Sequence, residues 1–327
     1  MLLIHLQYAD DAALASHSPA DLQRLIDSEV STFNKCGLVV NASKTEILCQ
    51  LSPTVQLASH PQLHAGIQDL NCVHHFSYLG SIISSSCLLD SEIESRIRLA
   101  SSAFSRLSNR VFACSRNLNT STKVAVYKAV CISALLYGCE SWTTYRSHIR
   151  NLESFHTRCL QRILGLTWAD RVPHTTILES TGCLSIVSLI ISQQLRWITP
   201  YVIRMSENRL PRKLFYGELV HGQRTPGGQK KRYRDHLHSI LKLCNIPAND
   251  LESPAADRPS RRSISRTGVT SFEANRTQAR ETQRQLRHQL QQQAQDSPSS
   301  DLGTFYPRCA RRCASEFGLR SHMRIHK

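Results

Sequence analysis

Short apolar runs separated by polar breaks open the chain. Residues 2–6 and 12–15 are mostly apolar, and Tyr8-Ala9-Asp10-Asp11 lies between them. Two apolar runs flanking a short polar break are typical of a β-hairpin, so the two aspartates are expected at or beside its turn. The alternative interpretation of so short a motif is an exposed acidic turn without a chemical role.

A helix is predicted directly after this hairpin. Ser18 can cap it, Pro19 fits its first turn, and an apolar face with helical spacing continues to Phe33. Gly37 is the residue type that commonly ends a helix. Short strands are then predicted at residues 38–40, 47–49 and 76–83, the last of them a strand pair that turns at Gly80.

The apolar pattern changes to helical spacing after residue 90. Ser91-Glu92-Ile93-Glu94 has the spacing of a capping box, and Arg96 is expected on a solvated face of the following helix. Val130 belongs to the apolar stripe of the next predicted helix, whereas His156 lies off the stripe of the third. Pro200 should kink or end a fourth helix, because proline lacks an amide donor. These helices are predicted to begin near residues 91, 120, 149 and 185.

The two patterns together predict an α+β fold. Strands and one helix occupy residues 1–85, and a mostly helical region covers residues 86–205. Apolar periodicity is lost after residue 246 in a stretch rich in Pro, Ser, Gln and Arg. Residues 246–303 are therefore predicted to be a largely disordered linker with a solvated helix.

The charge of the chain favours a polyanionic partner. Its 40 basic and 25 acidic residues give a formal net charge of +15, although a basic surface alone does not require nucleic acid. Nine basic residues against two acidic ones lie between positions 204 and 234. The segment 206–245 is therefore predicted to bind nucleic acid, through Lys230, Lys231, Arg232 and Arg234 above all.

Cysteine usage and hydropathy bear on the compartment. Twelve cysteines lack a regular spacing, and the first residues lack the basic start of a secretory signal. Reduced thiols are thus expected, in an intracellular protein of the nucleus or cytoplasm that is not secreted. The longest nearly apolar run, residues 183–191, is much shorter than the roughly 20 residues that cross a bilayer. No membrane span is expected.

Asp10 and Asp11 could together bind divalent cations. Mg²⁺ prefers oxygen ligands, and two ions about 3.5–4 Å apart can stabilise both the attacking and the leaving oxygen of phosphoryl transfer. The sequence therefore predicts part of a two-metal Mg²⁺ site at the first hairpin.

The order of several motifs resembles the reverse transcriptases of non-LTR (LINE-type) retrotransposons. After the Tyr-Ala-Asp-Asp hairpin and its helix come Gly37-Leu38, Asn41 and Lys44-Thr45-Glu46, and then Phe76-Ser77-Tyr78-Leu79-Gly80. Leu136-Tyr137-Gly138-Cys139-Glu140-Ser141-Trp142 continues the likeness. In that family, residues 1–85 would be the rear of the polymerase palm and residues 86–205 the thumb.

The resemblance implies RNA-directed DNA synthesis on a primer–template of RNA and DNA. Asp10 and Asp11 would bind Mg²⁺, and Lys44 would protonate the departing pyrophosphate. The primer would be contacted by Tyr8 and, in a primer grip, by Tyr78, Leu79 and Gly80.

The same resemblance implies that part of the active site is missing. The family's third metal-binding aspartate and its fingers precede the hairpin, but only nine residues precede Asp10. We therefore expect a truncated polymerase that needs the absent N-terminal half for activity. The alternative is a non-catalytic nucleic-acid-binding remnant that acts through its basic segments. A helical scaffold for proteins is a third hypothesis, and it would need exposed apolar stripes.

Residues 304–327 resemble a damaged zinc finger. Cys309, His322 and His326 have the second half of the finger spacing, but Tyr306 stands where the family pattern has the first cysteine. Cys313 is the available substitute. A small ββα-like module that binds Zn²⁺ through these four residues is one expectation, and a module without tight zinc binding is the other.

Overall fold

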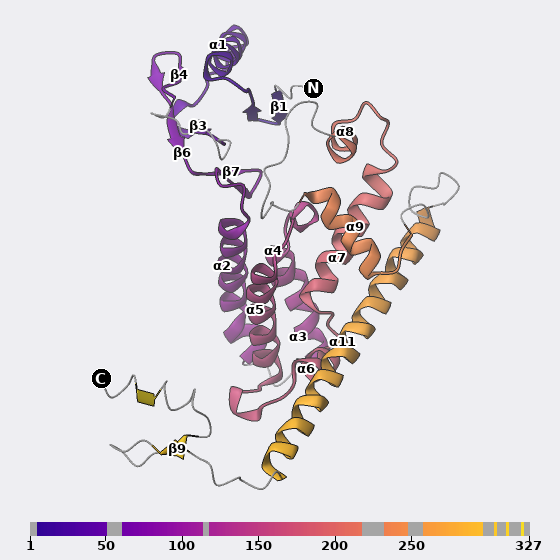
Figure 1. The fold of residues 1–327 in the computed structure, drawn as a ribbon. Helices are drawn as coiled ribbons and strands as arrows, with labels where there is room; N and C mark the ends of the chain where they lie inside the picture. Colours follow the sequence, from indigo (N-terminus) through magenta and orange to yellow (C-terminus); the bar gives the residue numbers. More distant parts are fainter. Residues whose placement is uncertain are drawn as a thin grey trace. The chain divides into compact units, whose positions relative to one another are not determined.

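The computed structural model describes residues 5–50, 61–113, 118–217, 232–247, 258–296, 304–305, 312–313 and 322–323. The chain divides into two compact units, residues 1–270 and 271–327. Short strands near the N-terminus and helices after residue 90 give an α+β fold, as the sequence predicts (Figure 1).

The described strands form two-stranded sheets. The predicted hairpin at the N-terminus is confirmed, with Ala9 and Asp10 in its turn, and so is the strand pair that turns at Leu79 and Gly80. Strand β3 pairs in parallel with β6, whereas the other pairs are antiparallel. The bounds are β1 His5–Tyr8, β2 Asp11–Leu14, β3 Glu46–Leu48, β4 His64–Ala65, β5 Gln68–Asp69, β6 Asn71–Val73, β7 His75–Tyr78, β8 Ser81–Ser84, β9 Thr304–Phe305 and β10 Arg312–Cys313.

Helix α1 (Pro19–Lys35) begins and ends as predicted. The Ser18 hydroxyl accepts a hydrogen bond from the Asp21 amide at 3.1 Å, and Gly37 has a φ of 75° just after the helix. The predicted strand at residues 38–40 is wrong. The Leu38 amide instead donates to the Phe33 carbonyl at 2.9 Å and closes the helix end, and Val39 is 88% exposed. The Leu38 amide is therefore used to cap the helix and is not available to pair with a neighbouring strand.

A small core holds the N-terminal strands against α1. Its buried members come from α1, from the 3₁₀ turn η1 (Ala42–Lys44), from β3 and from the residues beside β4 and β6. Leu14 of β2 packs against it and thereby attaches the first hairpin. The buried residues are Ile26, Ala42, Ile47, Leu63 and Leu70.

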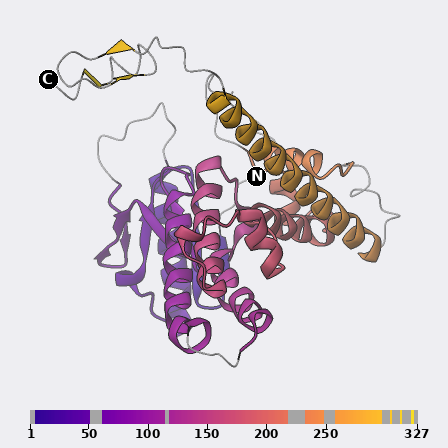
Figure 2. The same ribbon diagram turned by 90° about the horizontal axis from the view of Figure 1, so that it is seen from below.

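A larger core lies within a bundle of helices after residue 90. Helices α2 and α5 lie side by side, and α3 also packs on α5 (Figures 1 and 2). Trp142, Tyr127, Leu152 and Leu160 are each at most 2% exposed in this core. The bounds are α2 Asp90–Leu107, α3 Thr120–Tyr127, α4 Ser133–Leu135, α5 Arg146–Leu164, α6 His174–Thr181, α7 Ile186–Trp197, α8 Leu210–Tyr216, α9 Tyr233–Leu243 and α11 Arg258–Asp296.

Shorter helical segments interrupt or connect these helices. Three are π-helical, and the third of them contains Pro200. Helix α7 ends at Trp197, just before that segment, so the predicted effect of Pro200 is confirmed. The segments are η2 Ser108–Ala113, η3 Lys128–Ile132, η4 Cys139–Ser141, η5 Trp168–Asp170 and η6 Ile198–Val202.

Several sequence expectations for the bundle are wrong. Helix α2 begins at Asp90 without a side-chain cap, so the residues from Ser91 to Glu94 do not form the predicted capping box. Arg96 and His156 are buried, not solvated, and Val130 is 42% exposed. The buried positions in η3 are Cys131 and Ile132, and Cys131 follows Tyr127 by four residues and precedes Leu135 by four.

Helix α11 covers much of the predicted linker and contains the boundary between the two units. Its N-terminal part lies against residues 244–246, and its described side chains from Glu281 onward are exposed. Gly268 allows the close approach, because a Cβ there would lie 2.7 Å from Ile246 Cδ1. The helix extends over 39 residues and is thus longer than the solvated helix expected near residues 277–295, and its first part is not solvated, since Arg261 and Val269 are buried.

Candidate nucleic-acid interface

The first hairpin places Asp10 in its turn and Asp11 at the start of β2. Tyr8 pairs with Asp11 across the turn, and Ala9 has a φ of 52°, in the left-handed region. Both aspartates are exposed, and Tyr8 is 65% exposed. His5 lies 3.3 Å from a carboxylate oxygen of Glu29 on α1, which ties the hairpin to this helix. The two carboxylates are therefore presented to solvent on a short, tethered loop.

The donor set at this hairpin is incomplete for a two-metal site. Carboxylates suit Mg²⁺, so Asp10 and Asp11 fit as two of its ligands. Among the described residues, however, no group of three or more His, Cys, Asp or Glu side chains is placed to hold a metal ion. The carboxylates could hold a cation only with ligands from elsewhere.

Lys44 lies between the small core and solvent. It is exposed at the end of η1, where its backbone amide donates to the Asn41 side chain at 3.3 Å. Ile47, three residues later, is buried in the small core. The proposed proton-transfer role of Lys44 stays a prediction.

The second hairpin, β7–β8, presents an exposed turn of two residues. Leu79 has a φ of 48° and Gly80 a φ of 79°, as in the two-residue turns that match the twist of paired strands. Leu79 is 40% exposed, and the rings of Phe76 and Tyr78 stack with centroids 6.3 Å apart. The predicted primer-grip residues Tyr78, Leu79 and Gly80 are thus together at one tight turn, whereas Tyr8 lies in the first hairpin.

A buried ion pair on α2 fixes this turn. Glu92 accepts one hydrogen bond from Arg96 Nε at 2.7 Å and another from the Ile82 amide at 2.7 Å. The side chain of Glu92 is only 2% exposed and that of Arg96 only 6%. Arg96 also donates to the Gly80 carbonyl. The pair therefore joins the first turns of α2 to the hairpin turn at Gly80 and to strand β8 at Ile82.

Tyr137, in the turn between α4 and η4, contacts the same hairpin turn. Its hydroxyl donates to the Leu79 carbonyl at 3.0 Å, and its ring lies 4.7 Å from the Arg96 guanidinium carbon. Gly138 has a φ of 72°, and a Cβ there would lie 3.1 Å from Ser81 Oγ. We name Glu92, Arg96 and Tyr137 the turn clamp.

Sequence reasoning missed the turn clamp. The spacing of Glu92 and Arg96, four residues apart at a helix start, was the available signal for an ion pair. It could not show that strand β8 would cover the pair. Tyr137 belongs to a motif that carried the resemblance, but no role was assigned to it.

The basic segment is described in part. Arg232 makes hydrogen bonds of 2.9 and 3.2 Å to the carboxylate of Asp235, which offsets part of its charge. The guanidinium carbons of Arg234 and Arg212 lie 6.0 and 5.7 Å from the centre of the Tyr216 ring. This places basic and aromatic side chains together on α8 and α9, a combination found in nucleic-acid-binding surfaces. Lys230 and Lys231 lie outside the described residues.

The predicted zinc ligands are mostly outside the described part of the chain. Cys309 and His326 lie outside it, and only the backbone of Cys313 is described, in β10. Strands β9 and β10 pair with Phe305 opposite Arg312. His322 is partly buried. Zinc binding therefore stays a prediction.

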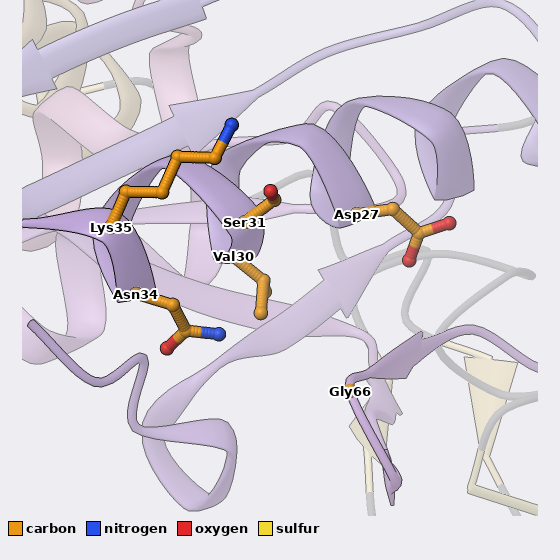
Figure 3. Close-up of a pocket in the computed structure, with 6 residues that line it drawn as sticks. All are labelled: Asp27, Val30, Ser31, Asn34, Lys35 and Gly66. Atoms are coloured by element: carbon orange, nitrogen blue, oxygen red, sulfur yellow. The ribbon is translucent and has the colours of Figure 1, made fainter.

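A shallow depression of about 540 Å³ lies between α1 and the β4–β5 turn (Figure 3). None of the predicted site residues lines it. Its lining residues are Asp27, Val30, Ser31, Asn34, Lys35 and Gly66.

Membrane-spanning potential is limited among the described helices. None of them alone has the length and apolar character to cross a bilayer. Among the described helices, only α6 and α7 taken together have that length and apolar character. The angle between these two helices at the break is 56°.

Comparison with known proteins indicates a transposon-related origin. The chain is 26% identical over 247 residues to the transposon-derived protein F52C9.6 of Caenorhabditis elegans, covering 73% of this chain and 85% of that protein. No protein-family model matches the chain. No solved structure matches it either.

Proposed function

We propose that this chain is the rear part of a retrotransposon-encoded RNA-directed DNA polymerase of the non-LTR type. It would contact the primer–template duplex through the β7–β8 turn and present Asp10 and Asp11 toward the primer end. The observation that carries the proposal is the turn clamp. An exposed two-residue turn held by a buried ion pair suits a rigid contact element for a nucleic-acid backbone. The transposon-derived relative and the order of motifs support it.

The chain is proposed to bind without synthesising DNA alone. Bound Mg²⁺ would stabilise negative charge on the reacting phosphate. Asp10 and Asp11 would hold it from one side, and the described residues bring no third acidic group to them. Lys44 is exposed, so it could supply a proton only to a substrate that other protein parts position.

Binding to a recessed primer end tests this proposal. The full chain is titrated with an RNA template carrying a shorter DNA primer, and with a blunt RNA–DNA duplex of equal charge. We expect the recessed end to bind about tenfold more tightly, a difference of about 1.4 kcal/mol. Equal affinities would contradict the proposal. Primer extension that survives Asp10→Asn/Asp11→Asn would refute the assignment of the carboxylates.

A second candidate function is nucleic-acid binding through the basic segments alone. The observation that favours it is the grouping of Arg212, Arg234 and Tyr216, beside Arg232, on α8 and α9. This candidate requires no carboxylate and no fixed turn. It predicts that any polyanion of similar charge density competes equally, whereas the polymerase proposal predicts that a recessed primer end competes best.

Neutralising three basic residues shows whether the affinity for nucleic acid depends on the basic segment or on the total charge of the chain. In Lys230→Gln/Lys231→Gln/Arg232→Gln, we expect the slope of log K against log salt to fall by about 2–3, because about one counterion is released per phosphate contact. The matched control removes three arginines of α11, Arg280→Gln/Arg284→Gln/Arg287→Gln. Equal losses in both variants would show that total charge, not the basic segment, sets the affinity.

A further inference from the structure

Two cysteine side chains meet on the parallel strand pair β3–β6. Cys72 lies in β6 opposite Ile47 of β3, and Cys49 follows Ile47 by two residues. Side chains alternate along a strand, so residues 47 and 49 face the same way and Cys49 is the diagonal neighbour of Cys72. Their Sγ atoms are 4.0 Å apart. Both thiols pack against the small core and are partly exposed.

We propose that Cys49 and Cys72 form a reversible disulfide, a modification site in which oxidation ties β3 to β6. A disulfide has an S–S length of about 2.05 Å, so the sulfurs must approach each other by about 2 Å. Rotation of the two side chains on adjacent strands can supply that movement. The inference does not depend on the proposed function.

The other described cysteines differ from this pair in burial. Cys131 and Cys159 are 0% and 4% exposed inside the bundle, where burial raises the pKa of their thiols to about 11 and about 12. An oxidant in solution reaches them only when the bundle opens. Cys36 and Cys87 are exposed. The pair is thus accessible and already in contact, a combination that makes a second, intramolecular step fast.

The reaction balances with a disulfide oxidant such as oxidised glutathione. One thiol loses its proton, attacks the oxidant's disulfide and forms a mixed disulfide while one glutathione thiolate leaves. The second thiol loses its proton and attacks the protein sulfur, which releases the other glutathione. Two protein thiols are thereby oxidised, and one oxidised glutathione is reduced to two thiols.

The location gives the disulfide a structural consequence. Leu14 of the first hairpin and both cysteines pack on the same small core, and β3 contacts β7 of the second hairpin. The parallel pair has only two strands, so few backbone hydrogen bonds hold it. Oxidation would therefore fix covalently the part of the chain that connects the two hairpins.

Proton loss sets the rate of the first step. Burial raises the pKa of the Cys49 thiol, and the neighbouring Cys72 raises it further. Because the thiolate is the nucleophile, oxidation should be slow at pH 7 and accelerate as the pH rises toward 9.

Redox titration of the full chain tests this inference. The reduced protein is equilibrated with glutathione buffers of rising oxidised fraction at pH 8, alkylated and digested for mass spectrometry. We expect a Cys49–Cys72 linked peptide to replace both alkylated peptides together, without an adduct of glutathione on either. Cys49→Ser and Cys72→Ser should each leave the remaining cysteine as a glutathione adduct, and Cys36→Ser should still form the link.

Two results would overturn the inference. One is independent alkylation or glutathione addition at Cys49 and Cys72 in the wild-type chain across the whole titration. The other is a link from either cysteine to Cys36 or Cys87 at equal yield, which would show random pairing of accessible thiols.

Discussion

Replacing Glu92 with alanine is expected to lower the free energy of unfolding by about 3–5 kcal/mol. The substitution leaves the Arg96 guanidinium 6% exposed without its carboxylate, and it removes the acceptor of the Ile82 amide. A buried charge without a counter-charge is the costly result, more than the loss of the attraction itself. Denaturant unfolding of the full chain, followed by far-ultraviolet circular dichroism, measures the change.

The same helix offers a matched control. Glu94 is two residues away and exposed, so Glu94→Ala should change stability by no more than about 0.5 kcal/mol. For the partner variant Arg96→Ala, which leaves the buried Glu92 carboxylate unpaired, the matched control is Arg98→Ala, because Arg98 is exposed. Equal effects of Glu92→Ala and Glu94→Ala would show that Glu92 contributes only helix-end electrostatics and that the turn clamp does not hold the hairpin.

Replacing both Glu92 and Arg96 by apolar residues distinguishes the cost of an unpaired buried charge from the loss of the hydrogen bonds that hold the turn. In Glu92→Leu/Arg96→Met, no unpaired charge remains, so we expect a smaller loss than in either single alanine variant. The Gly80 carbonyl and the Ile82 amide still lose their partners in the double variant. The turn should therefore become sensitive to protease although the bundle keeps its stability.

Acid is expected to destabilise the bundle through His156. Burial lowers the pKa of this histidine from its usual 6.5 to about 4. Its Nε2 donates to the Leu184 carbonyl at 3.3 Å and its Nδ1 accepts from the Tyr127 hydroxyl at 2.9 Å, an arrangement that suits the neutral ring. The titratable groups that act on it electrostatically include His174, Glu153 and Lys128.

The direction of this effect follows from proton linkage. At pH 7.5 and above the ring is largely neutral in both the folded and the unfolded chain, so nearly the full stability is present. As the pH falls, the unfolded chain binds a proton first and gains stability. The loss should reach about 2 kcal/mol at pH 5 and about 3 kcal/mol at pH 4. Denaturant unfolding at pH 7.5, 6 and 5 measures it.

Two variants identify the responsible group. His156→Gln cannot take up a proton, so its stability should vary little between pH 7.5 and 5. His238 is exposed on α9, and His238→Gln should keep the wild-type dependence on pH. A His156→Gln chain that loses stability as steeply as the wild type would assign the acid sensitivity to other groups.

Features set by neighbouring residues could be predicted from the sequence. Ser18 and Gly37 define the ends of α1 because capping acts within a few residues, and the turns at Ala9-Asp10 and Leu79-Gly80 follow from short polar or glycine-containing breaks. The predicted α+β class follows from the change of apolar spacing near residue 90. These conclusions require no knowledge of what packs against each element.

The features that were missed depend on contacts between distant residues. Glu92 lies between the two residues of the predicted capping box, Ser91 and Glu94, but strand β8 covers it and supplies the Ile82 amide. His156 lies off the apolar stripe of α5, yet Tyr127 and Leu184 provide polar partners that allow burial. A polar residue is buried only where such partners exist, and periodicity within one helix does not reveal them.

Cross-linking from the second hairpin tests the proposed nucleic-acid contact most directly. A photoreactive phenylalanine analogue replaces Leu79 at its exposed turn or, as a control, Ile67 in the β4–β5 turn, where the side chain is fully exposed. Each chain is irradiated with an RNA template and a labelled DNA primer. We expect the Leu79 variant to cross-link to the last nucleotides of the primer strand and the Ile67 variant to give few cross-links. Equal yields from both turns, or cross-links spread evenly along the duplex, would contradict the proposal.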